Sequence, residues 1–331
     1  MLKGATFIGN LLVDYIKIID HFPHIGRLCN MGETSRCVGG LAANTPIDLK
    51  VLAPELHVAS MGMVGNDENG RYIIEKIASY DIDVSGIVVH DRLPTSFTDV
   101  MTEQETGIRT FFQQQGAGAA YGYDEVDFPR VKTTHAHIGY ALLQERMDSA
   151  DPVYGTVMAK ALHTLSQLGI RTSMDAVTAT GRDYPSVIKP CLPHVDYLFM
   201  NEIEAEYTCE KPIRDNDGSL SQAKVQEACQ MLLSYGVRTA VILHAPEGGW
   251  AMARSGEFCY RPSMRLPAGY IKGSCGAGDA FCAGMLYALI EGLPLPVGLE
   301  IANLSSAANL SCSNSIDGMR SLGEMMARNR P

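Results

Sequence analysis

The stretch GSCGAGDAF at residues 273–281 combines glycines, a carboxylate and the predicted start of a helix. Gly276, Ala277 and Gly278 have small or absent side chains, so backbone N–H groups can approach a ligand closely there. After them, small and apolar residues recur at helical spacing as far as Gly292, which predicts a helix ending at that glycine. The first N–H groups of a helix lack internal partners, so this turn can bind phosphate oxygens or a developing negative charge.

Asp279 is the carboxylate within that first turn. It can act chemically on a ligand held by the glycine loop. It can also do no more than offset the positive end of the helix dipole. The local pattern leaves both interpretations open.

A second group of polar residues lies near the start of the chain. Asp14 falls in an apolar run that predicts a strand over 13–19, and a carboxylate there needs a partner, which the hydroxyls of a ligand could supply. An edge strand facing water is the alternative. Gly39 and Gly40 indicate a close backbone approach before an Ala-rich helix, and Asn44 on its first turns favours a hydrogen bond over helix propensity.

Asn201 and Glu204 follow a strand predicted over 197–200, at the edge where open α/β sheets usually bind ligands. Glu204 could hold Mg²⁺ through water, or these residues could simply cap the next helix. His135 and His137 would share one face of a strand. Because no third ligand candidate accompanies them, ordinary packing is expected there rather than a metal site.

Predicted strands and helices alternate along much of the chain, and they must position these residues. This alternation predicts an α/β fold with a mostly parallel sheet and crossover helices. Four extended runs could form a small separate sheet, acting as a lid or an oligomer contact; they lie at 13–19, 34–38, 96–101 and 108–113. The other predicted strands cover 4–9, 56–63, 82–89, 136–143, 171–176, 197–200, 238–244, 250–253 and 257–260. Helices are predicted over 69–80, 153–168, 184–192, 222–235 and 297–310, and after Gly40 and Gly276.

Composition excludes several classes of function. The 331 residues are 46% hydrophobic, enough for a large core, and the net charge of −10 disfavours a nucleic-acid surface. The nine cysteines are scattered without a CxxC pair, which favours reduced thiols and a cytoplasmic location. No apolar run approaches the roughly 18 residues of a membrane span, so no membrane partner is expected.

Four short motifs follow one another along the chain: GGLAAN at 39–44, NEIEAE at 201–206, EGGW at 247–250 and GAGDAF at 276–281. Together they resemble the PfkB carbohydrate kinases, the ribokinase-like group, from Gly9 to about Gly318. The resemblance implies a three-layer αβα sandwich with a mostly parallel central sheet and a small β-sheet lid. It also implies a single kinase domain over 1–331, with lid strands from about 13–38 and 95–114, and a homodimer formed through the lid.

The resemblance implies transfer of the ATP γ-phosphoryl group to a sugar hydroxyl, with Mg²⁺. Asp279 would be the base, and the N–H groups of Gly276, Ala277 and Gly278 would form the anion hole. Glu204 would help to place Mg²⁺ through a water molecule. The sugar-side positions are Asp14, Gly39, Gly40, Asn44 and, by a looser match to LLQE, Glu145. The nucleotide-side positions are Asn201, His244, Gly248, Gly249 and Asn303.

Departures from the family pattern leave three questions open. Gly273 and Ser274 stand where Asp-Thr is usual, which puts a monovalent cation site for K⁺ in doubt. His244 and Ala245 stand in place of the first glycine of the nucleotide strand. Cys275, beside the anion hole, is either an oxidisable thiol at a helix N-terminus or a buried inert one.

The substrate also stays open. Leu41 stands where some ribokinases have Lys, which argues against assuming ribose. A nucleoside kinase of the same fold is one alternative, and a sugar- or nucleotide-binding relative that lost catalysis is another. Retention of Asp279 and the full GAGD motif argues against the second.

Overall fold

The main sheet of the computed structural model, which describes residues 1–328, is mostly parallel. Seven neighbouring strands are parallel, and β14 and β15 form an antiparallel edge. This confirms the predicted sheet type. In spatial order the strands are β15 (Phe258–Pro262), β14 (Gly248–Ala253), β13 (Ala240–Ala245), β12 (Tyr197–Asn201), β11 (Arg171–Ala176), β8 (Thr133–Ala141), β1 (Leu2–Gly9), β4 (His57–Gly65) and β5 (Asp83–His90).

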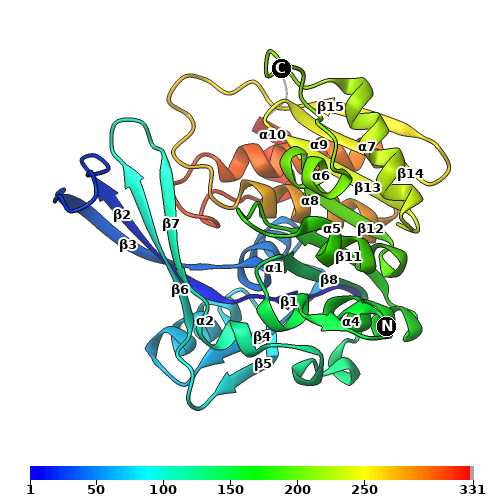
Figure 1. Cartoon of the computed structure of the whole chain (residues 1–331), viewed down its shortest axis with the longest axis horizontal. Helices are drawn as coiled ribbons and strands as arrows, with labels where there is room; N and C mark the ends of the chain where they lie inside the picture. The colour runs from blue at the N-terminus through cyan, green and yellow to red at the C-terminus, as the bar shows by residue number, and fades with distance from the viewer. Residues whose placement is uncertain (329–331) are drawn as a thin grey trace.

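Helices cover both faces of this sheet (Figure 1). Successive strand residues point to opposite faces, so Leu198 and Met200 join one core while Phe199 joins the other. The Phe199 side is packed by α1 (Leu41–Leu52), α2 (Glu68–Ala78), α8 (Ala277–Glu291) and α9 (Leu295–Asn309). The other side is packed by α4 (Val157–Gln167), α5 (Tyr184–Ile188), α6 (Glu202–Cys209) and α7 (Gln222–Ser234). The short helices α3 (Glu145–Asp148) and α10 (Leu322–Arg328) complete the set of α-helices in the described part.

A second, four-stranded sheet stands away from the main body, at the left of Figure 1. Its central strands β2 and β6 are parallel, and the outer strands pair antiparallel to them. This confirms the small separate sheet predicted from the four extended runs. Its strands, in spatial order, are β3 (Met31–Gly39), β2 (Leu12–Ile19), β6 (Ser96–Glu103) and β7 (Arg109–Gln114).

Two predicted helices begin or end elsewhere than expected. The helix predicted from Val153 begins at Val157, because the Asp151 carboxylate accepts the N–H groups of Val153 and Tyr154 at 2.9 Å and Gly155 adopts a φ of 85°. These contacts hold a turn between two-residue strands, β9 (Ala150–Asp151) and β10 (Gly155–Thr156). The helix predicted over 184–192 leaves α geometry at residue 189, because Pro190 and Pro193 have no N–H to donate.

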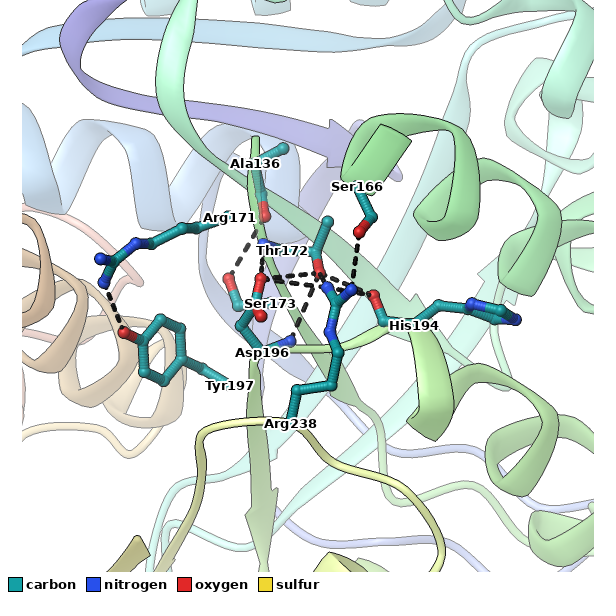
Figure 2. A network of polar contacts seen from close by, with 9 residues as sticks. All are labelled: Ala136, Ser166, Arg171, Thr172, Ser173, His194, Asp196, Tyr197 and Arg238. Carbon is teal, nitrogen blue, oxygen red and sulfur yellow. Dashed lines mark hydrogen bonds and ion pairs between the residues drawn. The ribbon is translucent and has the colours of Figure 1, made fainter. Parts of the chain in front are cut away.

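A polar network holds the amino ends of β11 and β12 together (Figure 2). Asn201 lies at the other end of β12, the carboxyl end. The Nη2 atom of Arg238 donates to Thr172 Oγ1 at 2.9 Å and to Asp196 Oδ2 at 3.1 Å, and its Nη1 atom donates to Ser166 Oγ at 2.6 Å. The carboxylate of Asp196 also accepts the backbone N–H of Thr172 at 2.8 Å. One guanidinium thus joins α4, β11 and the residue that precedes β12.

The nine cysteines are all unpaired thiols. Among residues 1–328, no helix is both long enough and apolar enough to cross a lipid bilayer.

Candidate active site

Asp279 lies on the first turn of α8, where it is only 6% exposed. The Nδ2 atom of Asn44 donates to Asp279 Oδ2 at 2.9 Å. The hydroxyl of Tyr140 donates to Oδ1 at 2.6 Å, and that of Thr45 at 3.2 Å. Three donors from α1 and the carboxyl end of β8 therefore hold both oxygens of one carboxylate, so its orientation is fixed.

Burial raises the pKa of Asp279 above that of an ordinary carboxyl. The hydrogen bonds from Tyr140, Asn44 and Thr45 act in the opposite direction, because they stabilise the charged form. The result is a carboxylate that is a stronger base than one in water yet remains hydrogen-bonded. Such a group suits proton transfer to or from a ligand.

Gly276 caps the amino end of α8 with a φ of 79°, a left-handed conformation that favours glycine. A Cβ added there would lie 2.5 Å from the carbonyl oxygen of Ser315. A Cβ on Gly278 would lie 3.5 Å from the His244 ring. The glycines thus allow the chain to turn tightly into the helix, and its first N–H groups have no partner within the helix. The sequence prediction of a glycine loop opening a helix is confirmed.

Two adjoining cavities meet at this helix start. One, of about 260 Å³, is lined by residues that include Tyr140, Asp175, Glu204, Gly276 and Asp279. The other, of about 660 Å³, falls in the size range of small-molecule sites, and residues that include Ser263, Met264, Ile271, Ala277 and Asn303 line it. Asn201, His244 and Gly278 line both cavities. The amino end of α8 therefore faces two neighbouring spaces, with Asp279 in the smaller.

Asn201 and Glu204 form the capping box of α6, which was one of the two interpretations of their spacing. Glu204 Oε2 accepts the N–H of Asn201 at 2.9 Å, and Oε1 accepts Asn201 Nδ2 at 2.7 Å and Thr178 Oγ1 at 3.0 Å. Burial raises the pKa of Glu204 to about 8. A buried carboxyl of this kind favours a nearby cation, because a cation would stabilise its charged form.

Asp14 lies on β2 with its carboxyl group against Gly39, whose missing Cβ leaves the space that the carboxyl occupies. Gly40 caps α1 with a φ of 87°. Burial, and after it the charge of Asp279, raise the pKa of Asp14, whereas the hydrogen bond from Thr98 and the charge of Arg109 lower it; the net pKa is about 7. The structure therefore brings Asp14, the paired glycines and Asn44 to the same region as Asp279.

Three residues predicted for the site lie elsewhere. Glu145 is exposed at the start of α3, and no hydrogen bond to the Asp279 cluster involves it within residues 1–328. Gly248 and Gly249 lie on β14 and are absent from the linings of both cavities. A Cβ on Gly249 would lie 2.8 Å from the Phe281 ring, and one on Gly248 would collide with the carbonyl of Arg261. Their small size serves packing within the protein.

The remaining predicted positions flank the larger cavity. His244 packs against Phe281 with 5.0 Å between ring centroids, and burial lowers its pKa to about 4, so it is neutral. Asn303 donates from Nδ2 to the carbonyl oxygens of Arg261 and Pro262 at 3.1 and 3.0 Å. Cys275 accepts a hydrogen bond from Ser315, and burial raises the pKa of its thiol, which favours the inert interpretation.

Sequence reasoning missed Tyr140, Thr45 and Asp175. Thr45 directly follows Asn44, and Asp175 lies at the carboxyl end of a correctly predicted strand, where a search of strand ends would have found it. Tyr140 gave no such signal, because the strand was predicted to run over 136–143, which placed Tyr140 in its interior and not at its carboxyl end.

Replacing Asp14 with Asn is expected to stabilise the protein increasingly as the pH rises. The folded state keeps Asp14 protonated up to about pH 7, whereas the unfolded chain releases that proton near the ordinary value of 3.8. Between these two pH values, the free energy of unfolding of the wild type therefore falls, relative to that of the variant, by up to about 1.4 kcal/mol per pH unit. Urea unfolding at pH 5 and pH 8 measures the difference.

The exposed Asp91 provides the control, and Asp91→Asn should change stability little at either pH. A stability difference between wild type and Asp14→Asn that is the same at both pH values would contradict the assignment of a buried, protonated Asp14.

Comparison with known proteins shows which family and which relatives the chain is similar to. The model of the pfkB family carbohydrate kinases matches residues 5–322. A nucleoside kinase of Methanocaldococcus jannaschii is 24% identical over 317 residues, covering 94% of this chain and 90% of the relative. A 5-dehydro-2-deoxygluconokinase of Shouchella clausii is 24% identical over 298 residues, covering 88% and 86%.

The fold agrees as well. The solved structure of Arabidopsis thaliana ribokinase complexed with ribose and ATP has a TM-score of 0.77 to this chain at 17% identity, covering 99% of this chain and 98% of that one. The resemblance inferred from four motifs is confirmed over nearly the whole length. The chain belongs to the pfkB family of carbohydrate kinases.

Proposed function

We propose that this protein transfers the γ-phosphoryl group of ATP to a hydroxyl of a sugar or sugar derivative. The residues act as one kinase domain over 1–331, with the small sheet as its lid. The observation that carries the proposal is the Asp279 carboxylate, held by Asn44 and Tyr140 at the helix start where two cavities meet. Phosphoryl transfer needs the acceptor hydroxyl on one side of such a helix start and the nucleotide on the other.

Asp279 orients the acceptor hydroxyl and accepts its proton late in the reaction. The N–H groups of Gly276, Ala277 and Gly278 stabilise charge on the transferring group. Because phosphoryl transfer passes through a loose transition state, positioning and charge stabilisation matter more than strong basicity. A carboxylate fixed by three donors meets that requirement.

The larger cavity fits ATP in size and in its lining. Its volume of about 660 Å³ suits a nucleotide, and the apolar side chains of Met264 and Ile271 can pack against a base. Asn201, His244 and Asn303 are the nucleotide-side polar residues in this proposal. Mg²⁺ supplies positive charge that neutralises the phosphates.

Glu204 fits Mg²⁺ as an outer partner. Mg²⁺ prefers oxygen ligands and keeps several of its waters. Both oxygens of Glu204 already accept hydrogen bonds from Asn201 or Thr178, so the carboxyl would hold the ion through water. On the acceptor side, Asp14 and Asn44 provide polar atoms for hydroxyls, and Gly39 and Gly40 allow the backbone to come close.

The region of Gly273 argues against dependence on K⁺. Nη2 of Arg109, from the small sheet, donates to the carbonyl oxygen of Ser313 at 3.0 Å, and a Cβ on Gly273 would collide with that guanidinium. A fixed positive charge thus occupies the space left by the missing acid. We expect the same turnover when K⁺ is replaced by tetramethylammonium, and several-fold stimulation by K⁺ would contradict this.

The test of the function is release of ADP from ATP and Mg²⁺ with a panel of acceptors. The panel contains pentoses, hexoses, sugar acids and nucleosides, because the relatives include a 5-dehydro-2-deoxygluconokinase and a nucleoside kinase. Turnover with a sugar or sugar acid is the expected result. Turnover confined to nucleosides would favour the second candidate, a nucleoside kinase. Tight sugar binding without turnover would indicate a relative that lost catalysis.

The small sheet is also the proposed contact of a homodimer. Phe111 and Phe112 on β7 are each 57% exposed, and Met31 on β3 is 58% exposed. Exposed apolar side chains and open strand edges favour pairing with a second copy around a two-fold axis. Sedimentation velocity should give a dimer for wild type and a monomer for Phe111→Asp. A monomeric wild type at micromolar concentration would exclude the dimer.

A further inference from the structure

Three side chains that can ligate a metal meet behind Asp279. His137 comes from β8, Asp175 from the carboxyl end of β11 and Cys282 from α8, and all three are buried. Cys282 Sγ lies 3.6 Å from His137 Nε2, and Asp175 Oδ2 lies 3.6 Å from the same nitrogen. One ligand atom from each residue lies within 4.8 Å of the other two.

These separations match a tetrahedral metal. With Zn–S near 2.3 Å and Zn–N and Zn–O near 2.0–2.2 Å, tetrahedral ligand atoms lie about 3.4–3.6 Å apart. The two separations at His137 Nε2 are both 3.6 Å. The third separation, between Cys282 Sγ and the Asp175 carboxylate, is no more than 4.8 Å, and side-chain rotation would have to close it for all three atoms to bind one ion.

The histidine is held in the form that a metal requires. His137 Nδ1 lies 2.8 Å from Ser173 Oγ, and that hydroxyl donates to the carbonyl oxygen of Ala136 at 3.4 Å, a bond drawn in Figure 2. Because the Ser173 hydroxyl donates its hydrogen to Ala136, its oxygen accepts a hydrogen bond from Nδ1–H of His137. The lone pair then lies on Nε2, which faces Asp175 and Cys282. Metal-binding histidines are commonly oriented by a hydrogen bond of this kind.

The carboxyl oxygen of Asp175 that does not face His137, Oδ1, is buried and has no hydrogen-bond partner among the described residues. Burial of an unpaired carboxyl oxygen is costly, and natural proteins keep such atoms where they serve a function. Gly139 has no Cβ, and a Cβ there would collide with this same oxygen. The backbone thus makes room for the carboxyl group at that position.

We propose that His137, Asp175 and Cys282 bind one borderline-soft divalent cation, for which Zn²⁺ is the best match. Imidazole nitrogen, thiolate sulfur and carboxylate oxygen together are a zinc ligand set, whereas Mg²⁺ prefers oxygens and six-coordination. Asp175 and Cys282 also line the cavity that contains Asp279, so the fourth position is open to that cavity. Binding releases to solvent the proton of the Cys282 thiol and that of any protonated carboxyl.

The test uses the full chain after chelator treatment, with Zn²⁺ alone titrated against a chromophoric chelator. Wild type should bind one equivalent, and Cys282→Ala and His137→Gln should each bind at least about 100-fold more weakly. Cys229→Ala is the matched control, because Cys229 is also fully buried but lies on α7 at the other face of the sheet. Ser173→Ala should weaken binding by about 10-fold through loss of histidine orientation.

Co²⁺ provides a readout independent of affinity and of activity. Wild type and Cys229→Ala should show tetrahedral d–d bands and a sulfur-to-cobalt charge-transfer band, which Cys282→Ala should lack. Far-UV circular dichroism identifies variants that fail to fold. If Cys282→Ala fails to fold, His137→Gln and Asp175→Asn provide the test instead, and both should lack the tetrahedral d–d bands. A charge-transfer band that persists in Cys282→Ala, or a wild type that binds less than one equivalent of Zn²⁺, would overturn the proposal.

Discussion

Asp279→Asn is expected to lower kcat by about 10³-fold or more while leaving affinity for ATP nearly unchanged. The substitution removes the base but keeps the shape of the side chain. The amide oxygen of the new Asn can still accept from Tyr140 and Thr45. The new NH₂ group would face the Asn44 amide, whose Oδ1 is buried without a partner, and a flip of that amide restores the hydrogen bond. The fold should therefore persist.

The measurement is steady-state kinetics with the acceptor identified in the panel, alongside equilibrium binding of ATP. Tyr140→Phe is the matched control, because it removes one hydrogen bond to the carboxylate but leaves the carboxylate in place. Its loss of kcat should be far smaller than that of Asp279→Asn. Retention of more than about a tenth of wild-type kcat by Asp279→Asn would refute the role of Asp279 as base.

Gly276→Ala is expected to lower kcat by about 100-fold. Its φ of 79° disfavours any side chain, and the added Cβ would lie 2.5 Å from the Ser315 carbonyl oxygen. The loop or the start of α8 must shift to relieve that contact. The N–H groups of Ala277 and Gly278 would shift with it, and a displacement of about 1 Å at a catalytic group can cost 10²-fold in rate.

Gly292 provides a control on the same helix. It caps the carboxyl end of α8 with a φ of 71°, and a Cβ there would have nothing within 4 Å. Gly292→Ala carries a similar backbone cost of about 1 kcal/mol, so thermal unfolding should register both variants. Only Gly276→Ala should lose turnover. Equal kinetics for the two variants would mean that the amino end of α8 plays no part in the reaction.

Apolar runs predicted most of the fold because the sheet is buried on both faces, so its strands are apolar almost throughout and differ sharply from the loops between them. The strand predicted over 171–176 matches β11 at both ends. The errors arise where one residue overrides the pattern. The apolar run from Val153 was expected to be helical, but Asp151 and Gly155 hold its first residues in a turn. The strand expected to reach residue 143 ends at Ala141, because Leu142 adopts a φ of 76°.

The candidate site was predictable where its residues occur in short motifs. Asp279, Asn44 and Asn201 each lie beside glycines or caps that are visible in the sequence. Tyr140, Asp175 and Cys282 are not, because their significance depends on which strands and helices lie side by side. His137 was expected to pack without a metal for lack of further ligand candidates along its strand. The thiol that approaches its Nε2 atom is 145 residues away, on α8.

The contact between α1 and α8 also constrains how the chain can mature during its synthesis. Asn44 and Asp279 are separated by 235 positions, and α8 packs against α1. A nascent chain that has emerged only as far as β15 has every strand of both sheets but lacks Asp279, and the apolar surface of α1 that α8 covers has no partner. The hydrogen bonds that Asn44 and Thr45 donate to Asp279 therefore form only after α8 has been synthesised.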